Sequence, residues 1–337
     1  MRIITCASYF ATGSSAVTDL FSEFEGVLSF DRYEYRILQD PDGISDLEYN
    51  IVENNHRHNT SHAIKRFIAL TKSFDSFGYG KKYPLYCGNF KQITEQYVNE
   101  ITELKTKTWW FRDRIDRGNL FCIIDRAYSL VKRIFTNGMH NERKYSMLAG
   151  KEDAFYSAID EQSFLLATRK YIDSIVNQGN PDQMEYVMVD QMVPPTNCNR
   201  YARYFNDVRI IVVDRDPRDV YLWEKTRINW GVIPTRTVEE YVKWFLITRK
   251  YSKCEDEDRQ RILRIKFEDL IYRYDDTVKV LCDFVGLPLE KHLNPLSKLV
   301  PEKSKNNTNL KTKIQGYEKD IEYIEEKLKD YLYDFNE

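Results

Sequence analysis

The hydrophobic pattern of the chain is dominated by a few short, continuous apolar runs. Three of them have the length and composition of buried strands: residues 1–7, 186–189 and 210–213. Such runs are typical of parallel strands that are covered on both faces. Residues 263–267 alternate apolar and polar side chains, which predicts a strand nearer the sheet edge, and residues 16–24 and 278–285 show helical spacing. The pattern therefore predicts an α/β fold, a central parallel sheet with helices on both faces.

The chain changes character between these regions. Residues 31–184 are charged, aromatic and irregular, with helical stretches but few apolar strands. We therefore expect a single domain in which residues 1–30 and 185–310 form the α/β core. Residues 31–184 would then form a mostly helical insertion, and a charged helix over 315–337 would close the chain.

Composition narrows the range of functions. The 337 residues include 50 Lys and Arg against 52 Asp and Glu, a net charge of −2, which argues against non-specific nucleic-acid binding. No stretch approaches the ~20 apolar residues that a membrane span requires. Six cysteines without metal-ligand spacing, and only five histidines, favour a cytoplasmic protein with reduced thiols and no metal site. The oligomeric state is not indicated.

A loop of small hydroxyl residues, 8–15, connects the first strand to the first helix. The first N–H groups of a helix lack backbone partners, so this corner is a candidate anion site. Gly13 lets the backbone approach an anion closely, and Thr12, Ser14 and Ser15 can donate hydroxyl groups. A serine-rich helix cap without a ligand is the alternative. No Gly-Lys-Ser/Thr follows, which disfavours a nucleoside-triphosphate kinase.

The apolar run at 210–213 leads directly into the turn Arg-Asp-Pro-Arg-Asp over 215–219. Pro217 suits the first turn of a helix, where its missing N–H is harmless. Arg215 lies where the strand becomes the turn, so its guanidinium can reach the ligand edge of the sheet and bind a phosphate. A structural salt bridge between Arg215 and Asp219 is the alternative.

Together these two motifs resemble the PAPS-dependent sulfotransferase superfamily, whose co-substrate is 3′-phosphoadenosine 5′-phosphosulfate (PAPS). A third match is Ile-Lys-Phe-Glu-Asp-Leu over 265–270, followed by Cys-Asp-Phe-Val-Gly-Leu-Pro over 282–288. The resemblance covers residues 1–30 and roughly 185–310. It implies a P-loop-like sulfotransferase fold and an enzyme that transfers a sulfonate from PAPS without a metal.

The resemblance also implies which residues bind the nucleotide. In relatives the first loop holds the 5′-phosphosulfate, the second motif holds the 3′-phosphate, and a late polar loop closes over the nucleotide. The matching positions here are Ala11, Thr12, Gly13, Ser14 and Ser15 in the first loop, Arg215 in the second motif, and Ser304, Lys305 and Asn306 in the late loop.

Two positions depart from the family pattern. Ala11 stands where many relatives place a lysine in the phosphosulfate loop, and Trp223 stands where many place a serine. Either other groups supply these contacts, or the chain is a nucleotide-binding module that has lost catalysis. A P-loop kinase is the remaining alternative.

Carbohydrate sulfotransferases of this superfamily commonly use a glutamate as general base, on the strand after the first helix. The matching strand is expected over 30–38, with Glu34 central and with Arg32 and Arg36 on the same face. Asp190, which follows an apolar run, is the second candidate, and His140 is a distant third. An ion-paired surface Glu34 and a capping Asp190 are the alternatives.

The acceptor is expected to bind in the unmatched region, 31–184. Aromatic and basic residues gather there: Trp109, Trp110, Phe111, Lys105, Lys107, Arg112 and Arg114. Such side chains can stack on sugar rings and meet an acidic glycan, although adjacent aromatics are more often part of a core. The sequence thus predicts sulfonate transfer to a hydroxyl of a carbohydrate, either a glycan or a glycan precursor.

Overall fold

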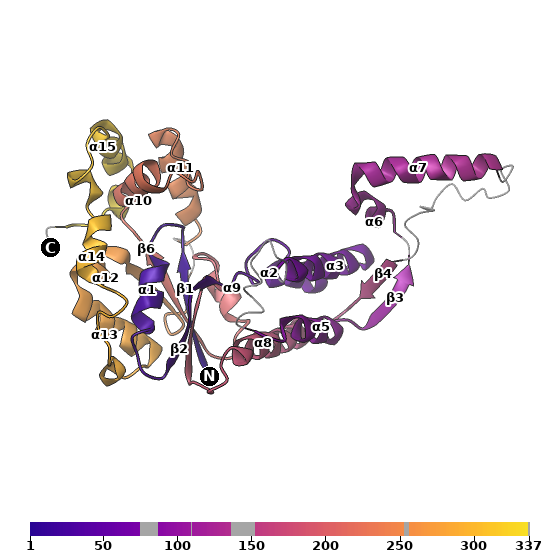
Figure 1. The fold of residues 1–337 in the computed structure, drawn as a ribbon, viewed down its shortest axis with the longest axis horizontal. Helices are drawn as coiled ribbons and strands as arrows, with labels where there is room; N and C mark the ends of the chain where they lie inside the picture. Colours follow the sequence, from indigo (N-terminus) through magenta and orange to yellow (C-terminus); the bar gives the residue numbers. More distant parts are fainter. Residues whose placement is uncertain (75–86, 109, 136–151, 253–255, 336–337) are drawn as a thin grey trace.

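The computed structural model describes residues 1–74, 87–108, 110–135, 152–252 and 256–335. A sheet with its covering helices forms one end of the molecule, and an arm extends from it (Figure 1). The α-helices within these described ranges have the following bounds: α1 Ser14–Phe21, α2 Ile44–Glu48, α3 Arg57–Phe74, α5 Phe90–Glu100, α6 Phe111–Asp116, α7 Gly118–Phe135, α8 Glu161–Gln178, α9 Cys198–Ala202, α10 Pro217–Trp223, α11 Val238–Arg249, α12 Phe267–Tyr272, α13 Tyr274–Val285, α14 Pro301–Ser304 and α15 Glu318–Lys327.

The central sheet has five strands in the order β2-β5-β1-β6-β7, and every neighbouring pair is parallel. The strands are β1 (Arg2–Ser8), β2 (Val27–Glu34), β5 (Tyr186–Asp190), β6 (Val208–Asp214) and β7 (Ile262–Lys266). The three apolar runs form β1, β5 and β6 in the middle, and the alternating segment forms the edge strand β7. The predicted parallel sheet is confirmed.

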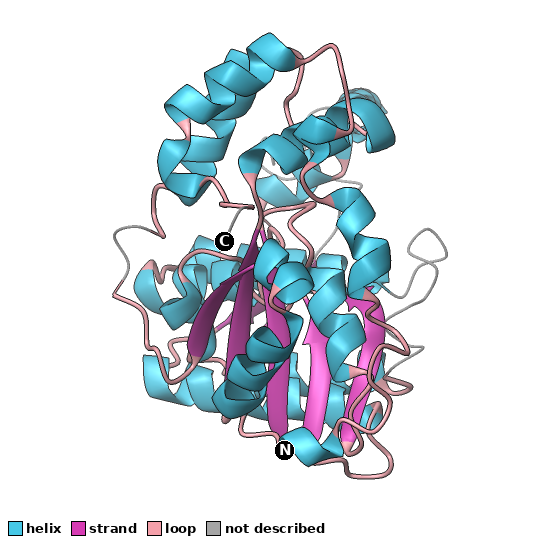
Figure 2. Cartoon of the chain, turned by 90° about the vertical axis from the view of Figure 1, so that its left-hand side faces the viewer, coloured by secondary structure: helices cyan, strands magenta, loops and turns pink. Residues whose placement is uncertain are grey.

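Helices cover both faces of this sheet, as the apolar periodicity predicts (Figure 2). Successive side chains of a strand point to opposite faces. On β6, Ile211 and Val213 belong to a buried cluster that includes residues of α1, α12 and α13, whereas Ile210 and Val212 belong to a second cluster, on the other face, that includes residues of α2, α3 and α8. A third cluster joins α10, α11 and α15 beside the sheet. Both faces are therefore buried.

The arm consists of α3, α5, an antiparallel ribbon of two strands, and the terminal helices α6 and α7 (Figure 1). The ribbon strands are β3 (Leu104–Thr108) and β4 (Glu152–Tyr156). The long helix α8 packs against α5 where the arm meets the sheet region. Helices thus predominate in the described part of the 31–184 segment, as the sequence predicts.

Two predicted elements are wrong in extent. The strand expected over 30–38 ends at Glu34, because Asp31 adopts a positive φ of 52° and the register with β5 shifts between Ser29 and Glu34. Glu34 is therefore the last residue of β2, and Arg36 lies beyond the strand. The closing helix is shorter than 315–337, because the chain leaves α15 and binds the turn after β6, where the Tyr333 N–H donates to Asp216 at 2.8 Å.

Candidate active site

The loop between β1 and α1 turns tightly at the carboxyl edge of the sheet. Gly13 has a φ of +100°, and a Cβ at this position would lie 2.4 Å from the Phe267 ring. Phe10 and Ala11 also adopt positive φ values, 76° and 56°. Helix α1 begins at Ser14, so its first N–H groups open onto this loop. The backbone therefore forms a tight turn beside the start of α1, which we call the anion cradle, and a side chain at Gly13 would collide with Phe267.

The hydroxyl groups of the loop have different partners. Thr12 is buried, and its Oγ1 accepts the Tyr9 N–H at 3.2 Å and donates to the Val213 carbonyl at 2.7 Å. The proton of that hydroxyl holds the loop against β6 rather than facing a ligand. Ser14 donates to Asp190 Oδ2 at 3.5 Å and accepts from Gln191 Nε2 at 3.1 Å. Ser14, unlike Thr12, lines the open cavity at this edge.

The two candidate bases come together at the ends of neighbouring strands. Glu34 of β2 and Asp190 of β5 are register partners. Asp190 is 3% exposed, and its Oδ1 has no hydrogen-bond partner among the described residues. Burial, and secondly the charge of Glu34, raises the pKa of Asp190 to about 7. Glu34 is half exposed and lies 3.6 Å from the guanidinium of Arg36.

A cavity of about 950 Å³ contains this arrangement. Its lining includes every residue of the loop from Ser8 to Ser15 except Thr12, both carboxylates, and the aromatic rings of Tyr9, Trp223, Trp230 and Tyr251. Among the described residues that line it, Arg36 carries the positive charge. Ligands of parallel α/β sheets bind outside the carboxyl ends of the strands, which is where this cavity lies.

Arg215 lies beneath the loop rather than in the cavity. It is buried, donating from Nη1 to the Ala11 carbonyl at 3.0 Å and from Nη2 to the Asn307 carbonyl. Its guanidinium carbon lies 5.3 Å from the centre of the Phe267 ring, while its Nε has no partner within the described ranges. Asp219 instead accepts the N–H groups of residues 309 and 310, at 2.8 and 2.7 Å. Arg215 therefore joins the first loop to the late loop.

The late loop is held by a residue that sequence reasoning missed. Ser304 ends α14, and Lys305 and Asn306 follow in a short 3₁₀ turn. Arg227 donates from Nη2 to the Asn306 carbonyl at 3.0 Å and from Nη1 to Asn307. The late-loop residues do not line the cavity of about 950 Å³. The sequence does contain one indication of this role: Arg227 lies four residues after Trp223, so the two side chains are neighbours on a helix surface.

The aromatic and basic cluster predicted to meet the acceptor does not line the site cavity. Trp110 instead stacks on His58 at a ring-centroid distance of 4.4 Å. Lys105 and Lys107 lie on β3 and pair with Asp153. The remaining two basic residues pair with aspartates: Arg112 with Asp116, and Arg114 with Asp125. Trp109, His140 and the side chains of Arg32 and Phe111 lie outside the described residues.

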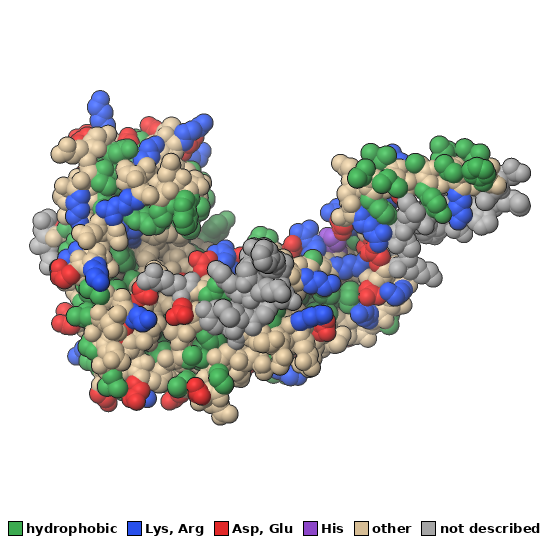
Figure 3. Space-filling model, in the orientation of Figure 1, with side chains coloured by type: hydrophobic (Ala, Val, Ile, Leu, Met, Phe, Trp, Pro, Cys, Tyr) green, Lys and Arg blue, Asp and Glu red, His purple; other side chains and the backbone are tan. Residues whose placement is uncertain are grey.

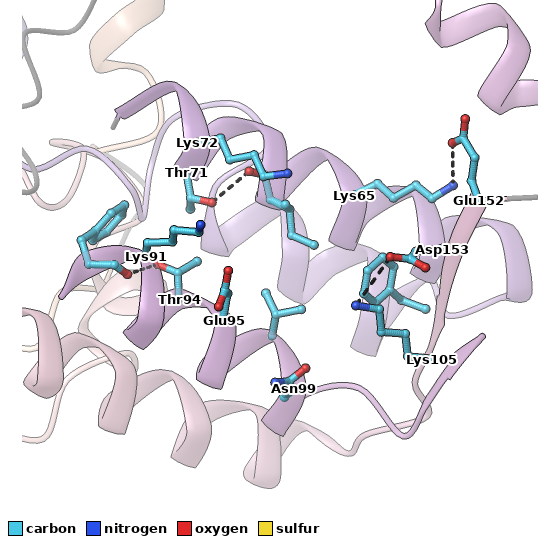
Figure 4. Close-up of a pocket in the computed structure, with 14 residues that line it drawn as sticks. Lys65, Thr71, Lys72, Lys91, Thr94, Glu95, Asn99, Lys105, Glu152 and Asp153 are labelled. Atoms are coloured by element: carbon cyan, nitrogen blue, oxygen red, sulfur yellow. Dashed lines mark hydrogen bonds and ion pairs between the residues drawn. The ribbon is translucent and has the colours of Figure 1, made fainter. Parts of the chain in front are cut away.

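A second cavity, of about 810 Å³, lies in the arm between α3, α5 and the ribbon (Figure 4). Four lysines and three carboxylates surround it: Lys65, Lys72, Lys91, Lys105, Glu95, Glu152 and Asp153. Figure 4 shows Lys105 beside Asp153 and Lys65 beside Glu152, each pair 3.6 Å apart. No residue of the sheet edge lines this cavity. The loop before α1 and the two carboxylates meet instead in the cavity at the sheet edge.

The described ranges contain no group of three or more His, Cys, Asp or Glu side chains that would hold a metal ion. None of the helices in these ranges is long and apolar enough to cross a membrane.

Comparison with solved structures finds sulfotransferases at low similarity. A sulfotransferase domain from the Synechococcus PCC 7002 olefin synthase has 11% identity and a TM-score of 0.39, covering 93% of this chain and 82% of that one. A retinol dehydratase in complex with androsterone and the inactive cofactor PAP has 15% identity and a TM-score of 0.35, covering 100% and 84%. A comparison with curated proteins finds no match.

A family model gives the stronger result. The model described as "Sulfotransferase family" matches residues 117–291, just over half of the chain, including β5, β6, the motif at 215–219 and β7. The kinase alternative is thereby removed. The Gly13 cradle and the N-terminus of α1 fit the phosphosulfate of the family's donor. This chain belongs to the sulfotransferase family and is a PAPS-dependent sulfotransferase.

Proposed function

We propose that this sulfotransferase transfers its sulfonate to a hydroxyl of a carbohydrate, bound in the sheet-edge cavity. The observation that carries the proposal is the carboxylate pair Glu34 and Asp190 beside the N-terminus of α1 in one open cavity. Carboxylates suit the activation of an aliphatic hydroxyl, which needs a proton acceptor as it attacks. The ring faces of Trp230 and Tyr251, both largely exposed, offer flat apolar surfaces against which a sugar ring can pack.

The reaction requires one proton acceptor and one stabilised leaving group. The acceptor oxygen forms a bond to sulfur as the bond between sulfur and the bridging oxygen of the donor breaks. The electron pair of that broken bond leaves with adenosine 3′,5′-bisphosphate, and the hydroxyl proton goes to a carboxylate. The N–H groups at the start of α1 and the hydroxyl groups of Ser14 and Ser15 are placed to stabilise the negative charge that develops on the leaving side.

We assign the proton acceptor to Glu34. Its side chain is half exposed and lines the cavity, so it can touch an incoming hydroxyl. The guanidinium of Arg36 lies 3.6 Å from its carboxylate. Asp190 is buried behind Ser14, whose hydroxyl group donates to it. Its pKa of about 7 suits a general base near neutral pH, which makes it the second candidate. The two carboxylates compete for one role, and a pH profile of each variant distinguishes them.

We also assign to Arg36 the positive charge that many relatives obtain from a lysine at the position of Ala11. Among the described residues that line the cavity, it is the one positioned to neutralise charge as the sulfonate moves. At the nucleotide end, we assign the 3′-phosphate to Arg215, with Ser304, Lys305 and Asn306 closing over it. The unpartnered Nε of Arg215 is the donor ready for that phosphate, and its Nη2 can exchange the Asn307 carbonyl for a phosphate oxygen.

An acceptor screen tests the proposed substrate class. Purified protein, PAPS and three acceptor types are combined: neutral and acidic oligosaccharides, small phenols, and a steroid alcohol. Mass spectrometry of the products should show a gain of one sulfonate on an oligosaccharide. Transfer to the phenol or the steroid, with no transfer to any oligosaccharide, would contradict the carbohydrate assignment while leaving the enzyme class intact.

A further inference from the structure

Helix α7, at the end of the arm, exposes its apolar face and packs its polar face against the protein, which is the reverse of an ordinary surface helix. At 100° per residue, its apolar side chains occupy about half of the helix circumference, and its polar side chains occupy the other half. In a globular protein the apolar face normally packs inward. Here the polar face packs inward and the apolar face is left in solvent.

The contacts with α6 fix this orientation. Arg114 of α6 pairs with Asp125 of α7 at 3.4 Å, and Asp125 is 2% exposed. Arg114 also donates to the Cys122 carbonyl at 3.3 Å, and the Cys122 thiol donates to the Arg114 carbonyl at 3.5 Å. These polar contacts lie on the face of α7 that carries Asp125. The opposite, apolar face is therefore directed away from α6.

Six large apolar side chains of α7 are each at least half exposed: Leu120, Ile123, Leu130, Val131, Ile134 and Phe135. We call these six side chains the apolar band of α7, and Figure 3 shows green side chains gathered along this helix at the free end of the arm. Exposed apolar patches that are contiguous mark interaction sites, whereas single exposed apolar residues are ordinary. The band therefore indicates a partner surface.

The charge of this end of the arm identifies the kind of partner. Residues 111–135 contain six Arg and Lys and three Asp, a net charge of +3, while the whole chain has −2. The rest of the chain therefore carries −5. Arg126 and Lys132 on α7 are exposed, whereas Asp125 is buried against Arg114. Basic side chains therefore flank the apolar band. The band would fit an apolar interior, and the basic side chains would fit negative charges at the surface of that interior.

We propose that α7 lies in the interface of an anionic lipid bilayer, with its apolar band inserted and its basic residues at the headgroups. An apolar arc of ~180° suits a lipid interface, because lipid covers the whole arc whereas a single packed helix covers a narrower stripe. A two-fold contact between copies would bring two segments of charge +3 together. The proposal is independent of the acceptor and of the roles of the catalytic carboxylates.

Vesicle flotation tests the proposal with the full-length protein. Wild-type protein should float with vesicles of phosphatidylcholine and phosphatidylglycerol, and at least tenfold less with phosphatidylcholine alone. The triple variant Ile123→Ser, Leu130→Ser, Ile134→Ser should lose anionic-vesicle binding by tenfold or more. A matched triple variant, Leu166→Ser, Leu289→Ser, Leu293→Ser, changes equally apolar, exposed side chains elsewhere and should bind as wild type does. The variant Arg126→Gln should bind the anionic vesicles more weakly, and its binding should depend less on salt concentration than that of wild type.

Two measurements keep the outcomes distinct. Circular dichroism and stabilisation by adenosine 3′,5′-bisphosphate establish that each variant is folded, so loss of flotation is not loss of structure. Failure of the folded wild-type protein to bind anionic vesicles at low salt would overturn the proposal. So would sedimentation as a dimer that the α7 serine variant dissociates, with no vesicle binding, because the band would then cover a second copy.

Discussion

The sheet edge and the end of the arm differ in the kind of side chain that they expose. At the sheet edge, apolar side chains such as Ile211 lie within the protein, and polar groups gather at one rim, where Glu34 and Asp190 meet the start of α1. At the end of the arm, Asp125 is buried and Ile123 is exposed. In our proposals the first arrangement is the reaction site and the second is the surface that attaches the protein to a lipid bilayer.

The largest effect is expected from blocking the loop. Gly13→Val should abolish PAPS and adenosine 3′,5′-bisphosphate binding, because a Cβ there would lie 2.4 Å from Phe267 and the φ of +100° excludes a β-branched residue. Isothermal titration measures the affinity. Ser15→Ala, which leaves the backbone unchanged, is the control and should retain most of it. Normal nucleotide affinity in folded Gly13→Val would show that another loop binds the phosphosulfate.

A pair of identical substitutions sharpens the comparison between the two regions. Ile211→Ala on β6 should lower the free energy of unfolding by about 2–5 kcal/mol, since it leaves a cavity in a fully buried face. Ile123→Ala on α7 should change it by no more than about 0.5 kcal/mol, since that side chain is 64% exposed. Urea unfolding monitored by fluorescence measures both. A large loss for Ile123→Ala would mean that α7 is packed in the folded protein.

The buried carboxyl at the sheet edge should make stability depend on pH. Asp190 has a pKa raised from 3.8 to about 7 in the folded protein, so between these values the folded state binds more protons than the unfolded state. Stability should therefore fall as pH rises from about 4 to about 7, and Asp190→Asn should remove that loss. The free energy of unfolding of Asp190→Asn, relative to that of wild type, should be larger at pH 8 than at pH 4 by up to about 4 kcal/mol.

The neighbouring carboxylate provides a check on this prediction. The charge of Glu34 is the second cause of the raised pKa of Asp190. The variant Glu34→Gln should therefore narrow the pH range over which stability falls, without removing the fall. Thermal unfolding across pH 4–8 gives both results. A pH dependence that is the same in Asp190→Asn and wild type would assign the effect to other buried carboxyls, such as Glu268, whose pKa burial raises to about 8.

A smaller effect is expected at the nucleotide's far end. Arg215→Ala should weaken adenosine 3′,5′-bisphosphate binding by about 1.5–3 kcal/mol, the value of a lost charged hydrogen bond. Adenosine 5′-phosphate, which lacks the 3′ group, should bind almost as before. Arg227→Ala is the control, because Arg227 holds the same late loop from an exposed position. Equal losses for the two nucleotides would leave Arg215 as a tie between the loops at Ala11 and Asn307.

The sequence predicts the sheet and its ligand edge well, because local patterns determine them. Continuous apolar runs identify β1, β5 and β6, and Pro217 marks the start of α10. The strand that carries Glu34 begins three residues earlier and ends four residues earlier than predicted, because its bend at Asp31 and its shifted register depend on pairing with β5. Periodicity within a segment carries no information about such a shift.

The contacts that position the site were not predictable for a similar reason. Arg215 meets Asn307, and Arg227 meets Asn306, across about 80 to 90 residues of sequence. The acceptor residues were placed by composition, yet Trp110 packs on His58 in the arm. Composition indicates which side chains are available, but only the fold determines which of them share a cavity.

The central claim is that Glu34 takes the acceptor proton at the sheet edge. Single-turnover transfer to an accepted oligosaccharide, at saturating PAPS, measures it most directly. Glu34→Gln keeps the shape of the side chain and removes its basicity, so the transfer rate should fall about 10²–10⁴-fold while PAPS affinity persists, and Asp190→Asn should lose less. Near-normal transfer by Glu34→Gln, with a large loss in Asp190→Asn, would contradict the claim and make Asp190 the base.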